Sequence, residues 1–150
     1  MSLKKQIDLD IKNAMLAKNR GELEALRGIK SMILLAETDK GSTGELTNDA
    51  EMKLLMKAAK QRKESAEIFL QQSRKDLADV ELFQLDVINR YLPKQISEEE
   101  LTSELQNLIT AMGAKGPQDM GKVMGVATKN LAGRADGRVI SELVKKLLSN

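Results

Sequence analysis

The sequence contains no cysteine, no histidine and no tryptophan, and it has only two phenylalanines and one tyrosine. These absences exclude a thiolate nucleophile, an imidazole base and the usual ligands of structural zinc. Few routes to enzyme catalysis are left, so we expect no catalytic residue, no metal and no cofactor. A chain without cysteine is also typical of a reducing compartment.

Long apolar runs are missing as well. No segment approaches the roughly 20 apolar residues that a membrane-spanning helix needs, and the first residues lack the apolar core of a secretory signal. We therefore expect a soluble cytoplasmic protein with no membrane partner. The formal net charge of +2 is too small by itself to indicate a polyanionic partner.

Helix-forming residues are abundant. Leu, Ala, Glu, Lys, Gln and Met dominate, whereas runs of β-branched and aromatic residues are absent. Apolar residues recur at three- and four-residue steps, which predicts an all-α fold. This pattern places Met15 on the buried side of the first helix and Leu70 on that of the third. The glycines and polar residues at positions 39–44 predict a loop between the second and third helices.

Pro93 divides the predicted helices into two groups. Proline lacks a backbone donor and restricts the residue before it, so it ends the fourth helix. We expect an N-terminal domain of about four helices at residues 1–92 and a three-helix domain at residues 97–150, joined by a proline-containing linker. Ser97 and Glu100 form a capping box at the start of the second group, and Asp136 can cap the last helix. Pro117 is expected in the first turn of the sixth helix.

The sixth helix departs most from a plain amphipathic pattern. Residues 119–125 (DMGKVMG) combine interior glycines with a lysine, and a glycine–arginine turn follows at residues 133–138 (GRADGR). At 3.6 residues per turn, the apolar residues share one side of the helix: Met120, Val123, Met124, Ala127 and Leu131. A stripe of small residues lies next to them: Gly121, Gly125, Thr128 and Ala132. Lys122 and Lys129 lie just beyond this stripe.

Two interior glycines cost a helix about 2 kcal/mol relative to alanine, so a compensating role is expected. In one interpretation they let another helix approach closely, and a partner helix would then contact Gly121, Gly125, Thr128 and Ala132. In the other, a phosphate backbone lies against the exposed main chain while cations neutralise it. The RNA-binding candidates are Lys115, Lys122, Gly125, Lys129, Arg134 and Arg138.

Charge is unevenly distributed in this part of the chain. Residues 97–112 carry four glutamates and no cation, whereas residues 113–150 carry seven cations and three anions. The scarcity of aromatic residues argues against stacking on single-stranded bases and favours recognition of structured RNA by its shape and backbone.

Enzymatic arrangements have simpler explanations. Asp119 and Asp136 suit helix caps, and residues 41–44 lack the lysine of a phosphate-binding P-loop. Ser65 and Ser73 have no histidine to activate them. We predict no catalytic residues.

Several motifs together resemble the bacterial YqeY family. They are Gln61-Arg62-Lys63-Glu64-Ser65, Arg74-Lys75-Asp76-Leu77-Ala78, Tyr91-Leu92-Pro93, Asp119-Met120-Gly121-Lys122-Val123-Met124 and Ala135-Asp136-Gly137. The C-terminal part is also similar to the tail domain of GatB, a subunit of the glutamine-dependent amidotransferase that corrects misacylated tRNA. One departure is Ser73, since the family often has glycine before the arginine.

The resemblance implies an all-helical protein in two parts, with a small C-terminal domain of the GatB tail type. In the amidotransferase that tail helps to hold the tRNA, while the chemistry takes place in other domains. Three hypotheses follow. The first is a non-catalytic module that binds tRNA or a tRNA-processing complex. The second is a protein-interaction adaptor that uses the small-residue stripe. The third is a component of a carbon–nitrogen ligase with glutamine as amido-N-donor, which would need other subunits.

Overall fold

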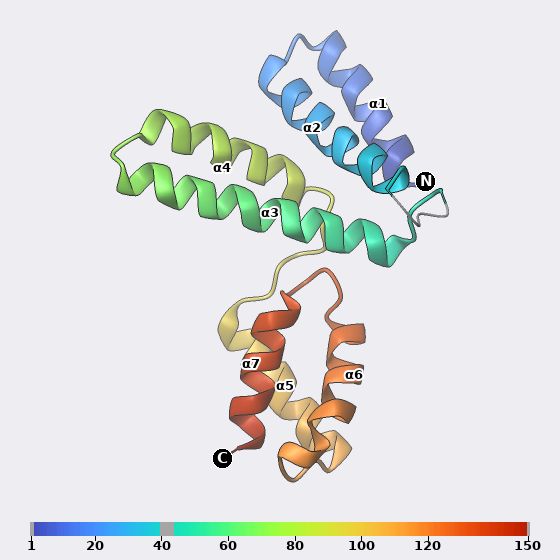
Figure 1. The fold of residues 1–150 in the computed structure, drawn as a ribbon, viewed down its shortest axis with the longest axis vertical. Helices are drawn as coiled ribbons and strands as arrows, with labels where there is room; N and C mark the ends of the chain where they lie inside the picture. Colours follow the sequence, from blue (N-terminus) through green and yellow to red (C-terminus); the bar gives the residue numbers. More distant parts are fainter. Residues whose placement is uncertain (1, 40–43, 150) are drawn as a thin grey trace. The chain divides into compact units, whose positions relative to one another are not determined.

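The computed structural model describes residues 2–39 and 44–149, and within these ranges the chain is all-helical, as predicted. The predicted loop at residues 39–44 lies mostly outside them. Seven α-helices and one short 3₁₀ turn follow one another (Figure 1). In chain order they are α1 (Leu3–Leu16), α2 (Arg20–Glu37), α3 (Asn48–Gln71), α4 (Lys75–Asn89), α5 (Glu98–Met112), η1 (Pro117–Asp119), α6 (Met120–Asn130) and α7 (Gly137–Leu148).

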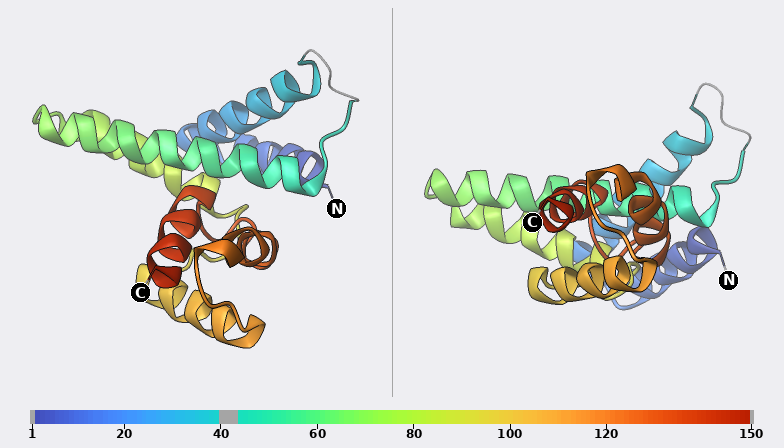
Figure 2. Two further views of the ribbon diagram at one scale, coloured as in Figure 1. Left: turned by 60° about the horizontal axis from the view of Figure 1, so that its bottom comes forward. Right: turned by 90° about the horizontal axis from the view of Figure 1, so that it is seen from below.

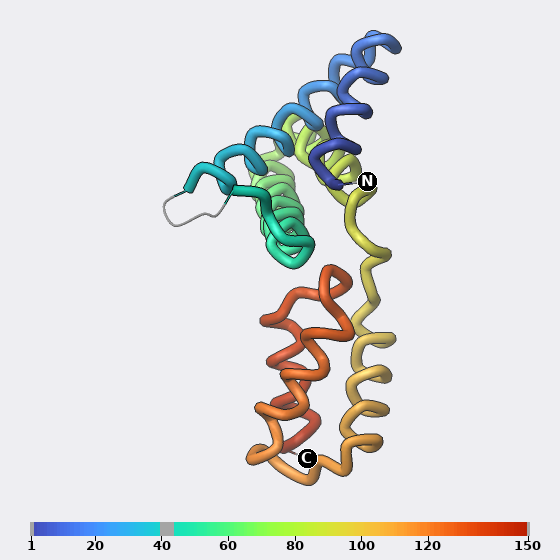
Figure 3. The backbone as a smooth tube through the Cα atoms, turned by 90° about the vertical axis from the view of Figure 1, so that its right-hand side faces the viewer, coloured from blue at the N-terminus to red at the C-terminus, as the bar shows by residue number. Residues whose placement is uncertain are grey.

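The chain separates into two compact units, Met1–Leu92 and Pro93–Asn150, which we call unit 1 and unit 2. Unit 1 ends at Leu92 and unit 2 begins at Pro93. Figure 3 traces the backbone through both units from blue to red. Each unit has its own hydrophobic cluster. That residues 1–92 and 97–150 are separate domains with a linker between them stays a prediction.

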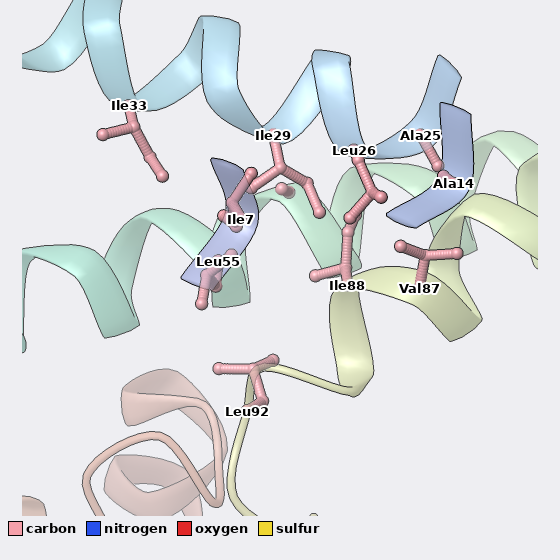
Figure 4. Packing of buried hydrophobic residues seen from close by; sticks show 11 residues of the cluster. Ile7, Ala14, Ala25, Leu26, Ile29, Ile33, Leu55, Val87, Ile88 and Leu92 are labelled. Atoms are coloured by element: carbon pink, nitrogen blue, oxygen red, sulfur yellow. The ribbon is translucent and has the colours of Figure 1, made fainter. Parts of the chain in front are cut away.

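Unit 1 consists of two antiparallel helix pairs, α1 with α2 and α3 with α4, and the second pair is the longer (Figure 2). Large aliphatic side chains from all four helices meet between the pairs, among them Ile7, Ile29, Leu55 and Ile88 (Figure 4). Burial of these side chains is the main source of stability in such a unit, because isolated helices of this length are marginal in water.

Two side chains that the sequence pattern assigned to this core are instead exposed. Met15 is 54% exposed and Leu70 is 52% exposed. Both lie in the last turn of their helices, at the end of a helix pair. A residue off the shared side of a helix pair is covered only where a third element packs there, and the periodicity of a single helix carries no information about such an element.

Helix ends in unit 1 are defined by local chemistry. Ser2, Asn19 and Thr47 each accept a backbone N–H in the first turn of the following helix. Ser73, after α3, has a left-handed backbone with φ of 58°, and the Arg74 N–H donates to the Phe69 carbonyl at 2.8 Å. This Schellman arrangement is usually built on glycine. Ser73 therefore occupies a position where the resemblance indicated glycine.

Unit 2 buries one side of each of its three α-helices. The cluster consists of Leu101, Leu105, Ile109, Val123, Ala127, Leu131, Ile140, Val144 and Leu148. Ser97 caps α5 by accepting the Glu100 N–H, and Asp136 caps α7 by accepting the Arg138 N–H, both as predicted. The expectation for Pro117 was wrong, because this proline begins the 3₁₀ turn and α6 starts only at Met120.

Candidate nucleic-acid interface

Asp119 directly precedes α6, but its side chain accepts no backbone N–H of that helix, so it does not cap α6 as the sequence suggested. Its Oδ2 atom accepts the backbone N–H of Lys115 at 2.9 Å, which closes the turn that contains Pro117. This bond explains why a tight 3₁₀ turn precedes the helix. Val123 and Ala127 are buried in the core, and Met120 and Met124 pack against it partly buried. The other residues of the helix are exposed. The carboxylate of Asp119 thus stabilises the turn before α6 by a hydrogen bond to the backbone.

The two glycines of α6 are exposed and uncovered. A Cβ atom built at Gly121 or Gly125 would meet no atom within 4 Å beyond the helix's own nearby backbone. Close packing of another described element of this chain therefore does not account for these glycines. Thr128 and Ala132 continue the exposed stripe, and the Thr128 hydroxyl donates to the Met124 carbonyl at 2.7 Å. Because the stripe is open, it could contact either a partner helix or a phosphate backbone, and both interpretations remain.

Lys122 and Lys129 lie on the outer side of α6, away from the core. Seven residues of helix place their Cα atoms roughly 10 Å apart along the axis. No acidic residue occurs in α6. Within residues 2–39 and 44–149, neither lysine forms an ion pair, and neither does Lys115. The outer side of α6 therefore presents uncompensated positive charge beside bare backbone.

Arg134 lies in the turn after α6, and its backbone is held from the preceding segment. Its carbonyl accepts the Ile96 N–H at 3.1 Å, and the Gly133 carbonyl accepts a hydrogen bond from Nε2 of Gln95 at 2.7 Å. Gly133 is buried with φ of 76°, a left-handed backbone conformation that favours glycine at this position.

The two predicted arginines differ from the lysines in having acidic neighbours. Arg134 lies 3.6 Å from Glu104 of α5, and Arg138 lies 3.4 Å from Glu142 one turn further along α7. All four side chains are partly or largely exposed, so these are weak surface pairs. The three lysines and the two arginines are thus not equivalent in the positive charge that they can offer to an anion.

The prominent motif residues of unit 1 hold helices together. Arg62 pairs with Glu81 at 3.0 Å between α3 and α4, and the Tyr91 hydroxyl donates to Asp10 of α1. Burial and the Asp10 carboxylate raise the pKa of Tyr91, which keeps its hydroxyl protonated as a donor. These contacts give the motifs of unit 1 a structural explanation.

Arg74 and Asp76 form a two-bond contact at the start of α4, with distances of 3.1 and 3.0 Å. Their hydrogen bond lowers the pKa of Asp76 and raises that of Arg74. Asp76 therefore stays ionised in the first turn of α4, where a negative charge is favourable.

Among the described residues, no cluster of carboxylates is placed to hold a metal ion. No helix in the described part of the chain is long and apolar enough to cross a membrane. What unit 2 offers is an exposed helix side with spaced cations and open backbone.

Gln95 and Glu104 are the site residues that the sequence analysis missed. Each contacts the turn at residues 133–134 from 30 or more positions away in the chain. Helical periodicity and capping patterns report neighbours within about four residues, so neither could have identified these partners.

Comparison with known proteins agrees with the motif resemblance. A model of the family described as Yqey-like protein matches residues 4–148. The chain belongs to the YqeY-like family. The predicted membership of the YqeY family is therefore confirmed over almost the full sequence.

The curated relatives of this YqeY-like chain are fungal rather than bacterial. "Altered inheritance of mitochondria protein 41, mitochondrial" of Clavispora lusitaniae is 35% identical over 115 residues, covering 75% of this chain and 66% of the relative. The protein of the same name in Pyrenophora tritici-repentis is 30% identical over 147 residues, or 95% of this chain and 79% of the relative. That of Lachancea thermotolerans is 34% identical over 110 residues, covering 72% and 58%. The chain thus spans slightly less than two thirds of the Clavispora relative.

These names contradict the expected cytoplasmic location. All four relatives that we compared are named as mitochondrial proteins. The expectation rested on the lack of an apolar signal, and a segment of that kind is not what directs proteins to mitochondria. The names mention neither RNA nor an amidotransferase.

Proposed function

We propose that this YqeY-like chain is a non-catalytic module that binds structured RNA, with tRNA as the first candidate, through the outer side of α6. The observation that carries the proposal is the combination of Lys122 and Lys129, which have no acidic partner among the described residues, with the uncovered backbone at Gly121 and Gly125. A phosphate backbone needs both close approach and positive charge, and this surface offers the two together.

The surroundings of α6 support the same function. Lys115 precedes the helix in the chain, Arg134 and Arg138 follow it, and all three are at least partly exposed. The acids nearby are engaged locally, since Asp119 and Asp136 accept backbone N–H groups and Glu142 pairs with Arg138. No aromatic residue occurs in unit 2, so stacking on unpaired bases has no platform there. Recognition would depend on RNA shape and backbone.

A salt-dependent titration with tRNA tests the proposal. Mitochondrial tRNA belongs among the probes because the relatives are named as mitochondrial proteins. With four or five phosphate contacts, the slope of log affinity against log salt should be roughly −3 to −4.5. No detectable binding at low salt would rule the function out.

A partner helix on the small-residue stripe is the second candidate, favoured by the absence of any covering atom at Gly125. Gly125→Leu blocks close approach of a helix but keeps both lysines, whereas Lys122→Ala does the reverse. If a protein partner fits this surface, Gly125→Leu abolishes its capture and Lys122→Ala leaves it intact. An RNA site responds most strongly to Lys122→Ala.

Participation in a carbon–nitrogen ligase is supported only by the resemblance to GatB. The purified chain with glutamine, ATP and misacylated tRNA should give no turnover, because the sequence has no cysteine to act as a nucleophile and no histidine to activate a serine. Turnover that appears only after addition of amidotransferase subunits would support an accessory role.

A further inference from the structure

In the described part of the chain, Arg134 is the cation of the site whose backbone is anchored by residues far from it in sequence. Ile96 donates to its carbonyl and Gln95 donates to the carbonyl before it, at 3.1 and 2.7 Å. The preceding Gly133 is buried in a left-handed conformation. The Cα of Arg134 is therefore fixed, and only rotation of the side chain can redirect its guanidinium.

The guanidinium of Arg134 can contact either the carboxylate of Glu104 or a ligand from solution. Its Nη2 atom is 3.6 Å from Oε1 of Glu104, which lies in α5, whereas Arg134 lies in the turn between α6 and α7. The side chains are 37% and 47% exposed, so water and ligands can reach both. Exposed ion pairs at this distance are weak, whereas a guanidinium can bind a phosphate through two parallel hydrogen bonds.

We propose that Glu104 competes with RNA phosphate for the guanidinium of Arg134 and thereby limits the affinity of unit 2 for RNA. This inference rests on the proposed function. Binding exchanges the Arg134–Glu104 pair for an Arg134–phosphate pair and leaves the Glu104 carboxylate exposed to water. Removal of the carboxylate charge therefore increases affinity, provided that Arg134 is present.

Glu104→Gln tests this competition, with Glu99→Gln as the matched control. Both substitutions remove one negative charge from an exposed position of α5, but Glu99 forms no ion pair among the described residues. Dissociation constants for tRNA are compared at one salt concentration. Glu104→Gln should bind about two- to fivefold more tightly than Glu99→Gln, as expected for release of a surface ion pair. In an Arg134→Ala background the two variants should bind equally.

The outcomes separate this inference from the proposed function. Equal affinities of Glu104→Gln and Glu99→Gln in the full chain, with tRNA binding retained, would overturn the competition alone. So would an advantage of Glu104→Gln that persists without Arg134, because it would then reflect net charge. A full-length wild-type chain that does not bind tRNA would overturn both.

Discussion

The hydroxyl of Tyr91 donates a hydrogen bond to the carboxylate of Asp10, and so joins the residues after α4 to α1 across 81 positions of sequence. Asp10 also accepts a bond from Gln6 at 3.1 Å. Both Tyr91 and Asp10 are partly buried. This contact connects the first helix of unit 1 to the segment that leads into Pro93.

Tyr91→Phe should lower the free energy of unfolding by about 1–2 kcal/mol, because it removes a hydrogen bond to a charged acceptor in a partly buried place. Urea denaturation of the full chain measures this change. In an Asp10→Asn background the same substitution should cost less. Equal costs in the two backgrounds would show that the hydroxyl does not depend on Asp10.

The same contact predicts a pH dependence at high pH. The raised pKa of Tyr91 means that the fold favours the protonated hydroxyl over the phenolate. Its stabilising contribution is complete below the ordinary tyrosine value of about 10 and is lost as the pH rises above it. Between pH 9 and about 11, wild type should therefore lose more stability than Tyr91→Phe, and parallel losses would contradict the account.

Ser73→Gly should stabilise unit 1 by about 1 kcal/mol. The left-handed conformation of Ser73 strains any residue with a Cβ atom, and glycine removes that strain. Ser65→Gly is the matched control, because Ser65 lies inside α3, where glycine costs about 0.5–1 kcal/mol relative to alanine and less than that relative to serine. Thermal unfolding should shift up for the first variant and down for the second. A decrease for both would show that Ser73 is not strained.

Substitution of a glycine of α6 by alanine should increase stability but weaken RNA binding. Gly125→Ala fills open space in a helix interior, so it should stabilise unit 2 by about 0.5–1 kcal/mol while weakening RNA binding. Gly133→Ala should destabilise, since Gly133 is buried with φ of 76°. Denaturation and tRNA titration of the same preparations check both effects. Unchanged RNA affinity of Gly125→Ala would show that the open backbone is not used.

Local features of this fold were accessible from sequence. Ser97 and Asp136 cap their helices as expected because a cap needs only a side chain and a backbone N–H a few residues on. The buried side of α6 followed from periodicity, and Val123 and Ala127 lie there.

Relationships between distant segments were not accessible. Gln95 and Glu104 contact the turn after α6 because the chain returns to them, which no local pattern encodes. Exposure of Met15 and Leu70 depends likewise on which elements end beside them. Only the structure could show that Gly121 and Gly125 are uncovered, because the same sequence also suits a buried crossing of two helices.

The salt dependence of tRNA binding by paired lysine variants tests the central claim most directly. The double variant Lys122→Ala/Lys129→Ala removes two cations from α6, and Lys53→Ala/Lys57→Ala removes two exposed cations from α3 in unit 1. The α6 variant should lower the magnitude of the log–log slope by about 1.4–1.8 relative to wild type, while the α3 variant leaves the slope unchanged. Equal slopes for the two variants would contradict an RNA interface on α6.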